Sequence, residues 1–228
     1  CALPIFICKS FVTTDALNAL AKKYGIKIYD DLMVGFKFIG KKILQKESEG
    51  EMFVAGFEES LGGLVGDQTR DKDAAMIGLI ISELASDLQK NNKTLGEKLD
   101  EIYSEIGFFT EKTESVEFSG SDGFNKMQEI MQKVKSGEET FGATKIKDFE
   151  SLTETNVATG EKSRFNMLEG GNAVSFEFMK PENRITIRPS GTEPKIKFYA
   201  QWLFAKKEDC AKIEEIITDF KRRILNEC

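Results

Sequence analysis

The sequence predicts two successive domains, an α/β domain over residues 1–106 and an α+β domain with a mainly antiparallel sheet over residues 107–228. Three observations support this. In the first half, short apolar runs alternate with segments whose apolar residues recur at helical spacing. After residue 107, strand-like segments follow one another with few helices between them. The length of 228 residues fits one large domain or two of ordinary size.

The first half begins with a β-α-β unit. A buried strand is expected over residues 4–9, and a helix that Thr13 or Thr14 can cap and Gly25 can close follows it. The other expected elements of this half are, in order, a strand over 26–29, a short helix over 37–45, a strand over 52–55, a long apolar-faced helix from Asp71 through Leu84, and a helix that a Thr94–Glu97 capping box starts and that ends near Gly107.

The second half has a different pattern. We expect a strand over 109–118, a helix over 122–135, and strands over 141–149, 173–179, 184–187 and 196–203. The last element is an amphipathic helix whose apolar face contains Ile213, Ile216, Ile217, Phe220 and Ile224.

The composition excludes several classes of function. The net charge is −6, from 32 Lys and Arg against 38 Asp and Glu, which argues against nucleic acid as the main partner. No apolar run reaches the roughly 20 residues of a membrane span. With no histidine there can be no His base and no Ser-His or Cys-His triad within the chain. No C-x-x-C spacing occurs among Cys1, Cys8, Cys210 and Cys228, which together with the lack of histidine excludes a zinc site within the chain. Four free thiols in a protein of this size fit a reducing cytoplasm.

The chain opens on Cys1, followed almost at once by an apolar run. A buried strand seldom begins a protein without residues before it. We therefore expect this sequence to be a piece of a longer protein.

The segment 188–194, Arg-Pro-Ser-Gly-Thr-Glu-Pro, is the most informative one in the chain. It lies between two strand-like runs, and Gly191 permits backbone conformations that other residues resist. Ser190 and Thr192 offer hydroxyl donors, and the Arg188 guanidinium suits a pair of phosphate oxygens. The segment is either an anion-binding loop or a β-hairpin turn of ordinary composition.

A second group of polar residues follows the predicted strand 52–55. Glu58 and Ser60 are two residues apart, so in an extended loop they can project to the same side and bind sugar hydroxyls; the alternative is a solvated loop. Downstream, Asp71 and Asp73 suit a helix start. Lys72 is less expected in a first helical turn, which suggests that it faces an anion or a ligand oxygen.

Together these segments resemble the α-D-phosphohexomutases, the family of phosphoglucomutase and phosphomannomutase. Residues 34–37, Val-Gly-Phe-Lys, are similar to the family's Gly-aromatic-Lys loop, with Val34 where many members carry Thr. Glu58 to Ser60 resembles its sugar-recognition loop, and 71–73 the helix start that follows. Residues 188–192 resemble its phosphate-binding loop. The motifs occur in the family's order over nearly the whole chain.

The resemblance implies a fold and a set of ligand-binding residues. Residues 1–106 resemble the family's third domain, a β-α-β sandwich, and 107–228 its fourth, which is similar to TATA-binding protein. The sugar-binding residues would be Gly35, Glu58, Ser60 and Lys72. The phosphate-binding residues would be Arg188, Ser190, Gly191, Thr192 and Lys197.

The resemblance also implies a reaction. Family members transfer a phosphoryl group between O1 and O6 of a hexose phosphate, through a phosphoserine and a hexose 1,6-bisphosphate. The phosphoserine loop and the Asp-x-Asp-x-Asp loop for Mg²⁺ are absent from this sequence. The resemblance therefore assigns no catalytic residue and no metal ligand here. It makes the N-terminal domains of the same protein the partner, and the chain alone is expected to be inactive.

The form of the Glu58 loop, Gly-Phe-Glu-Glu-Ser-Leu-Gly over residues 56–62, is closer to bacterial phosphoglucomutases than to phosphoglucosamine mutases. Glucose phosphate is the expected substrate, and phosphomannomutase and phosphopentomutase remain alternatives. A non-catalytic sugar-phosphate binding module is a further alternative. The similarity of the fourth domain to TATA-binding protein raises nucleic-acid binding as an alternative. It is not expected, because the chain is acidic and has no basic stripe, and because fold does not imply function.

Overall fold

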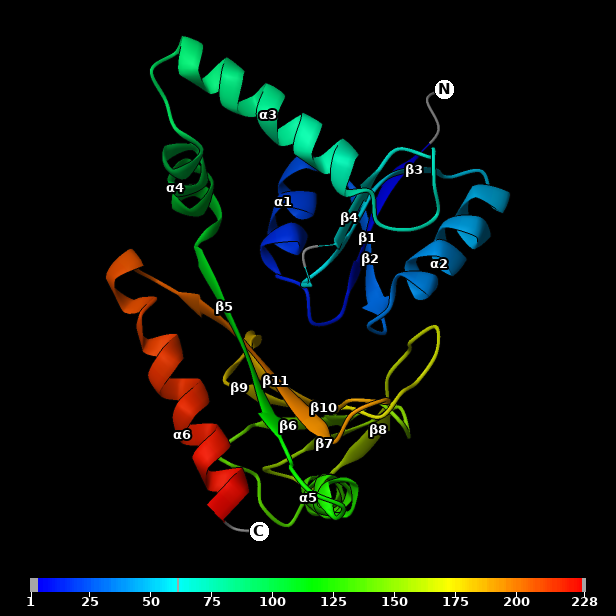
Figure 1. The fold of residues 1–228 in the computed structure, drawn as a ribbon, viewed down its shortest axis with the longest axis vertical. Coiled ribbons are helices and arrows are strands. Elements are labelled where there is room, and N and C mark those ends of the chain that lie inside the picture. Colours follow the sequence, from blue (N-terminus) through cyan, green and yellow to red (C-terminus); the bar gives the residue numbers. More distant parts are fainter. Residues whose placement is uncertain (1–3, 61, 227–228) are drawn as a thin grey trace. The chain divides into compact units, whose positions relative to one another are not determined.

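The computed structural model of the chain describes residues 4–60 and 62–226. The chain divides into two compact units, one ending at Phe108 and the other beginning at Phe109 (Figure 1). Each unit has its own sheet, in line with an α/β domain followed by an α+β domain. No helix within the described ranges is long and apolar enough to cross a membrane.

The first unit contains a four-stranded mixed sheet in the order β2-β1-β3-β4. Strand β1 is parallel to both of its neighbours, and β4 is antiparallel to β3. Because β1 is central, Phe6 and Cys8 on it are fully buried. The strands are β1 (Ile5–Ser10), β2 (Lys27–Leu32), β3 (Met52–Glu58) and β4 (Gly62–Val65).

Helices α1 (Ala16–Tyr24) and α2 (Phe36–Ser48) connect the parallel strands. As expected, α1 ends at Gly25, whose φ of 65° is left-handed. The N-cap of α1 is Asp15 rather than Thr13 or Thr14, although the Thr14 hydroxyl does accept the N–H of Ala16 at 3.1 Å.

Two further helices follow β4: α3 (Ala74–Lys90) and α4 (Leu95–Ile106). The predicted capping box of α4 is confirmed, since Thr94 Oγ1 accepts from Glu97 N at 3.1 Å and Glu97 Oε2 accepts from Thr94 N at 2.7 Å. Helix α3 has an apolar face but no buried residue, and Leu79 on it is 57% exposed.

The second unit contains a seven-stranded sheet in the order β5-β11-β10-β9-β6-β7-β8. The pairings of β11 with β10, β10 with β9, β9 with β6, β6 with β7 and β7 with β8 are antiparallel. The strands are β5 (Phe108–Glu117), β6 (Lys145–Asp148), β7 (Thr153–Asn156), β8 (Lys162–Arg164), β9 (Val174–Phe178), β10 (Lys180–Pro189) and β11 (Lys195–Phe204).

The core of this unit lies between the sheet and helices α5 (Gly123–Ser136) and α6 (Lys212–Asn226). Alternate residues of β9, β10 and β11 point into it, and Phe176, Ile187 and Phe198 are fully buried. As predicted, α6 is amphipathic, and its buried face contains Ile213, Ile217, Phe220 and Ile224. A short 3₁₀ helix, η1 (Lys207–Asp209), precedes α6.

The predicted strand over 141–149 was wrong in its first half. Phe141 has a left-handed φ of 55°, and regular pairing begins only at Lys145. Strands β4, β7 and β8 were not predicted. They are three or four residues long. Strands β7 and β8 are polar at every position, so no apolar alternation marks these two.

Candidate functional site

The Glu58 carboxylate lies where two loops of the first unit meet. Glu58 is the last residue of β3 and is 8% exposed. Its Oε1 accepts the backbone N–H of Gly35 at 2.6 Å, and its Oε2 lies 3.9 Å from Lys72 Nζ. These residues come from the end of β3, the start of α2 and the segment before α3, so they converge at the carboxyl end of a parallel strand, where open α/β sheets bind ligands.

Two glycines make this arrangement possible. Gly35, the N-cap of α2, has φ 129° and ψ 122°, a conformation that residues with a Cβ resist. Gly62 pairs with Glu58 across β3 and β4, and a Cβ on it would lie 2.5 Å from Lys72 Cδ. Gly62 therefore leaves the space in which the Lys72 stem approaches Glu58.

Burial and the neighbouring polar groups act in opposite directions on the pKa of Glu58. Burial raises the pKa of the Glu58 carboxyl, while the Gly35 N–H and Lys72 act in the opposite direction. A hydrogen bond to Asp71, at 2.8 Å, raises the pKa of Lys72. Lys72 Nζ also lies 5.1 Å from the centroid of the Phe36 ring. A carboxylate held in this way has oxygen lone pairs left to accept from vicinal hydroxyls.

Two expectations about this region need correction. Lys72 does not lie in a first helical turn, because the N-cap of α3 is Asp73, whose Oδ1 accepts from Met76 N at 2.9 Å. Lys72 therefore lies just before the helix, and its ammonium group is paired with Asp71 at 2.8 Å. Ser60 is not in an extended loop with Glu58: Glu58 ends a strand, and Ser60 is exposed in the turn that follows.

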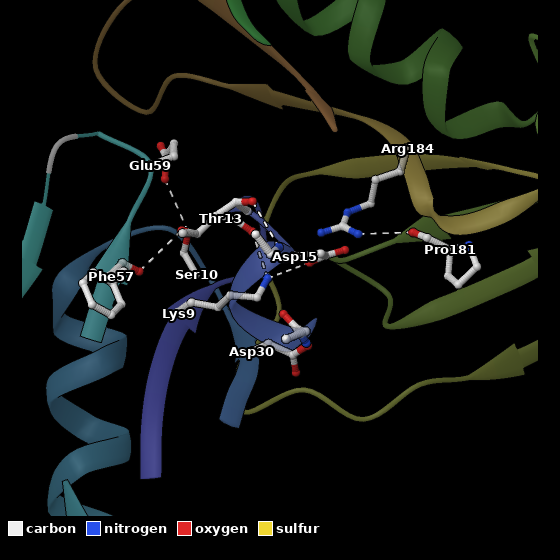
Figure 2. A network of polar contacts seen from close by, with 12 residues as sticks. Lys9, Ser10, Thr13, Asp15, Asp30, Phe57, Glu59, Pro181 and Arg184 are labelled. Atoms are coloured by element: carbon white, nitrogen blue, oxygen red, sulfur yellow. Dashed lines mark hydrogen bonds and ion pairs between the residues drawn. The ribbon is translucent and has the colours of Figure 1, made fainter. Parts of the chain in front are cut away.

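A polar network next to this site was not predicted from the sequence (Figure 2). Ser10 and Thr13 share a hydrogen bond at 2.8 Å, and Ser10 Oγ donates to Glu59 Oε2 at 3.3 Å. Lys9, 1% exposed, donates to Thr13 O at 2.9 Å and to Asp15 Oδ1 at 2.8 Å. The network links the end of β1 to the turn after β3. The signal in the sequence is a Lys-Ser pair that ends an otherwise apolar strand.

In the second unit, residues 190–194 form the turn of the β10–β11 hairpin. Arg188 is directly opposite Lys197, and Ser190 N donates to Lys195 O at 2.8 Å. The hairpin interpretation of this segment is therefore correct as a description of its backbone. It leaves open what the turn binds.

Inside the turn, Ser190 Oγ accepts from the backbone N–H groups of Thr192 and Glu193, both at 3.3 Å. Thr192 is exposed. The expectation for Gly191 needs correction: its φ is outside the left-handed region, and a Cβ on it would meet no atom within 4 Å. This turn does not require glycine for its backbone conformation.

Of the cationic side chains beside the turn, one has carboxylate partners among the described residues and two do not. Lys195 pairs with Glu117 at 3.0 Å and with Glu193 at 3.2 Å. Arg188 and Lys197, on neighbouring strands, have no hydrogen bond or ion pair from their side chains to any other described residue. Since β11 lies between β5 and β10, Lys197 is not on an edge strand of the sheet. Two adjacent uncompensated cations favour an anion.

Comparison with known proteins identifies the first unit. Residues 3–106 match the model of the family described as phosphoglucomutase/phosphomannomutase, alpha/beta/alpha domain III. The first unit belongs to this family, as its domain III. A phosphoglucomutase of Staphylococcus saprophyticus is 32% identical over 230 residues, covering 98% of this chain and 40% of that protein. One from Staphylococcus aureus strain N315 is 32% identical over 205 residues, covering 90% and 37%.

Two solved structures share the fold of this chain. Parafusin, a phosphoglucomutase from Paramecium in its open form, superimposes with a TM-score of 0.67 at 22% identity, covering 96% of this chain and 37% of that one. A phosphoglucomutase/phosphomannomutase family protein from Burkholderia thailandensis gives 0.54 at 11% identity, covering 97% and 38%. The chain spans about 40% of the length of the curated relatives it matches.

The resemblance to the family implies a Mg²⁺ ion. Over residues 4–60 and 62–226, no three His, Cys, Asp or Glu side chains are placed to hold a metal ion together. No step of the reaction is therefore assigned to a metal bound by these residues.

Proposed function

We propose that this chain is the substrate-binding part of a phosphohexomutase that interconverts hexose 1-phosphate and hexose 6-phosphate, with glucose as the hexose. The observation that carries the proposal is the buried Glu58 carboxylate, held by Gly35 N–H at 2.6 Å and faced by Lys72, in a domain of this family. The name of the staphylococcal relatives, phosphoglucomutase, supports glucose.

In this proposal Glu58 accepts from neighbouring sugar hydroxyls, and Ser60 adds a hydroxyl from the exposed turn. Gly35 holds one carboxylate oxygen, so the free lone pairs of Glu58 point in a fixed direction. Lys72 adds positive charge close to the sugar and attracts a phosphate oxygen. Hydroxyls in the middle of the ring occupy similar places in both orientations of a bisphosphate, so one carboxylate can serve both halves of the reaction.

The phosphate that is not reacting would bind to the turn of the β10–β11 hairpin. Arg188 and Lys197 supply charge without an internal carboxylate to displace, and the Thr192 hydroxyl is exposed. The backbone N–H groups that Ser190 Oγ accepts at 3.3 Å are only weakly engaged, so phosphate oxygens can compete for them. Gly191 keeps this face of the turn free of a side chain. Such binding positions the substrate and lowers the barrier at its distant end.

The phosphoryl transfer itself would use groups outside this chain. A phosphoserine of another domain would give its phosphoryl group to the free sugar hydroxyl, forming the hexose 1,6-bisphosphate. The serine would then take back the other phosphoryl group. Mg²⁺, held elsewhere, would polarise the phosphoryl oxygens.

Binding of glucose 1,6-bisphosphate to the full chain tests the proposal. In an NMR titration, backbone shifts should cluster at 35, 58–60 and 188–192. Arg188→Met removes a charge-assisted fork and should weaken binding about tenfold to a hundredfold. Lys162→Met is the matched control, because Lys162 is an exposed lysine of β8 outside the turn.

Shifts confined to other surfaces would contradict the proposal, as would an Arg188→Met variant that binds like Lys162→Met. Inorganic phosphate should shift residues of the turn without the shifts at 58–60, since it lacks the sugar hydroxyls that would donate to Glu58.

A further inference from the structure

The second unit contains a pocket that the proposed function does not use. It has a volume of about 300 Å³ and lies between α6 and strands β9 to β11. Its floor belongs to the core, and its walls include Phe178, Trp202, Ile216 and Phe220. This volume is at the lower end of the range for small-ligand sites, enough for one ring with a short side chain.

The walls are a contiguous group of aromatic rings. Phe178 and Trp202 lie 5.4 Å apart, centroid to centroid, with their planes inclined by 35°. Phe220 packs edge-on against Phe178 at 6.2 Å and against Phe141 at 5.0 Å in a tilted arrangement. Phe178 and Trp202 are only partly buried, whereas Phe176 and Ala200, two positions before them on the same strands, are at most 1% exposed. The core therefore ends in uncovered aromatic surface at this pocket.

The charged residues of the lining all come from one row of α6: Glu215, Asp219 and Arg223, each four residues apart. Arg223 is engaged by Glu139 at 3.3 Å and stacks 5.1 Å from the Phe141 ring. Asp219 pairs with Arg222 at 2.5 Å.

Glu215 differs from its neighbours in the row. Its carboxylate has no hydrogen bond or ion pair to any residue in the described parts of the chain, and it interacts only electrostatically with Lys212, whose ammonium group is hydrogen-bonded to Asp209. The charges of the pocket therefore leave one uncompensated negative charge beside aromatic faces. Both features attract a cation, and neither attracts a phosphate.

We propose that this pocket binds a small protonated amine that carries an aromatic ring. The ring would lie against Phe178 and Trp202, and the ammonium group would donate to Glu215, with Asp219 one helical turn further along. Charge complementarity selects this class over neutral and anionic aromatic compounds of the same size. The proposal stands independently of the mutase activity, because no residue of the pocket belongs to the sugar or phosphate sites.

Trp202 is the only tryptophan of the chain, so its fluorescence reports on this pocket directly. Phenethylamine should produce a saturable change in the emission of the full chain. Phenethyl alcohol, its neutral counterpart, should bind at least about tenfold more weakly, and hydrocinnamate more weakly still. Added salt should weaken the amine alone.

Glu215→Gln keeps the shape of the side chain and should weaken phenethylamine about tenfold. Glu214→Gln is the matched control, because Glu214 directly precedes Glu215 in α6 but pairs with Lys112 at 2.7 Å outside the pocket. Both substitutions are on the helix surface, and circular dichroism checks their folding.

Three results would overturn the proposal: no saturable change with phenethylamine, equal binding of the amine and the alcohol, or equal amine binding by the two variants. The NMR signal of the Trp202 indole N–H in the unaltered protein provides a test without any variant. Its shift on titration with each of the three probes should give the same order of affinity.

Discussion

At the scale of single residues, two adjacent glutamates, one ending β3 and one beginning the turn after it, have different partners. Glu58 is turned to the Gly35 N–H and Lys72, whereas Glu59 accepts from Ser10. A sequence shows only two carboxylates in a row. Their side chains point in different directions because consecutive residues of an extended chain alternate between its two sides.

The burial of Glu58 predicts a pH effect on stability. Burial raises the pKa of this carboxyl above its usual 4.5, so the folded state holds the proton more tightly than the unfolded state. Ionising the buried carboxyl lowers the free energy of unfolding. This loss of stability is absent below pH 4.5 and grows as the pH rises through the pKa of the folded state. In Glu58→Gln this loss is absent at every pH, so the stability of this variant relative to the parent should increase from pH 4 to pH 7, as measured by urea unfolding.

Glu49 provides the control of opposite sign. A hydrogen bond from Lys46 lowers the pKa of this exposed carboxyl, so its contribution is present above 4.5 and is lost as the pH falls. Glu49→Gln should therefore lose stability relative to the parent as the pH rises. The same direction of change in both variants would contradict the assignment for Glu58.

At the scale of elements, the best predictions came from local chemistry. The Thr94–Glu97 capping box, the Gly25 end of α1 and the apolar face of α6 each depend on residues close together in the sequence. The candidate site was predicted only in part. Glu58, Gly35 and Lys72 do come together, but the contributions of Gly62 and Ser10 depend on pairing between strands and on a loop contact 49 residues apart. No local pattern records such contacts.

Helix α4 should depend strongly on its cap. Thr94→Ala removes the hydroxyl that accepts from Glu97 N at 3.1 Å and should cost about 0.5–2 kcal/mol in the free energy of unfolding of the first unit. Ser104→Ala, in the last turn of the same helix, removes a hydroxyl that donates only to Glu101 O and should change stability by less than about 0.5 kcal/mol. Equal losses in chemical denaturation would show that the cap is not the cause.

At the scale of the whole molecule, the chain passes from one compact unit to the other once, at Phe108–Phe109. Gly107, with a left-handed φ of 99°, ends α4 just before β5 begins. We propose that limited proteolysis cuts first between residues 104 and 110 and leaves two resistant pieces. A single resistant body, with cuts only near the two ends of the chain, would contradict two independently stable domains.

The central position of β1 in its sheet has a consequence during protein synthesis. This strand leaves the ribosome before both of its partners, and β3 follows roughly 50 residues later, which at 5–20 residues per second takes about 2.5–10 s. During that interval one edge of β1 is unpaired and its apolar side chains have no cover, the condition in which nascent strands associate with each other. A chaperone that shields this short segment during translation would protect the whole first unit.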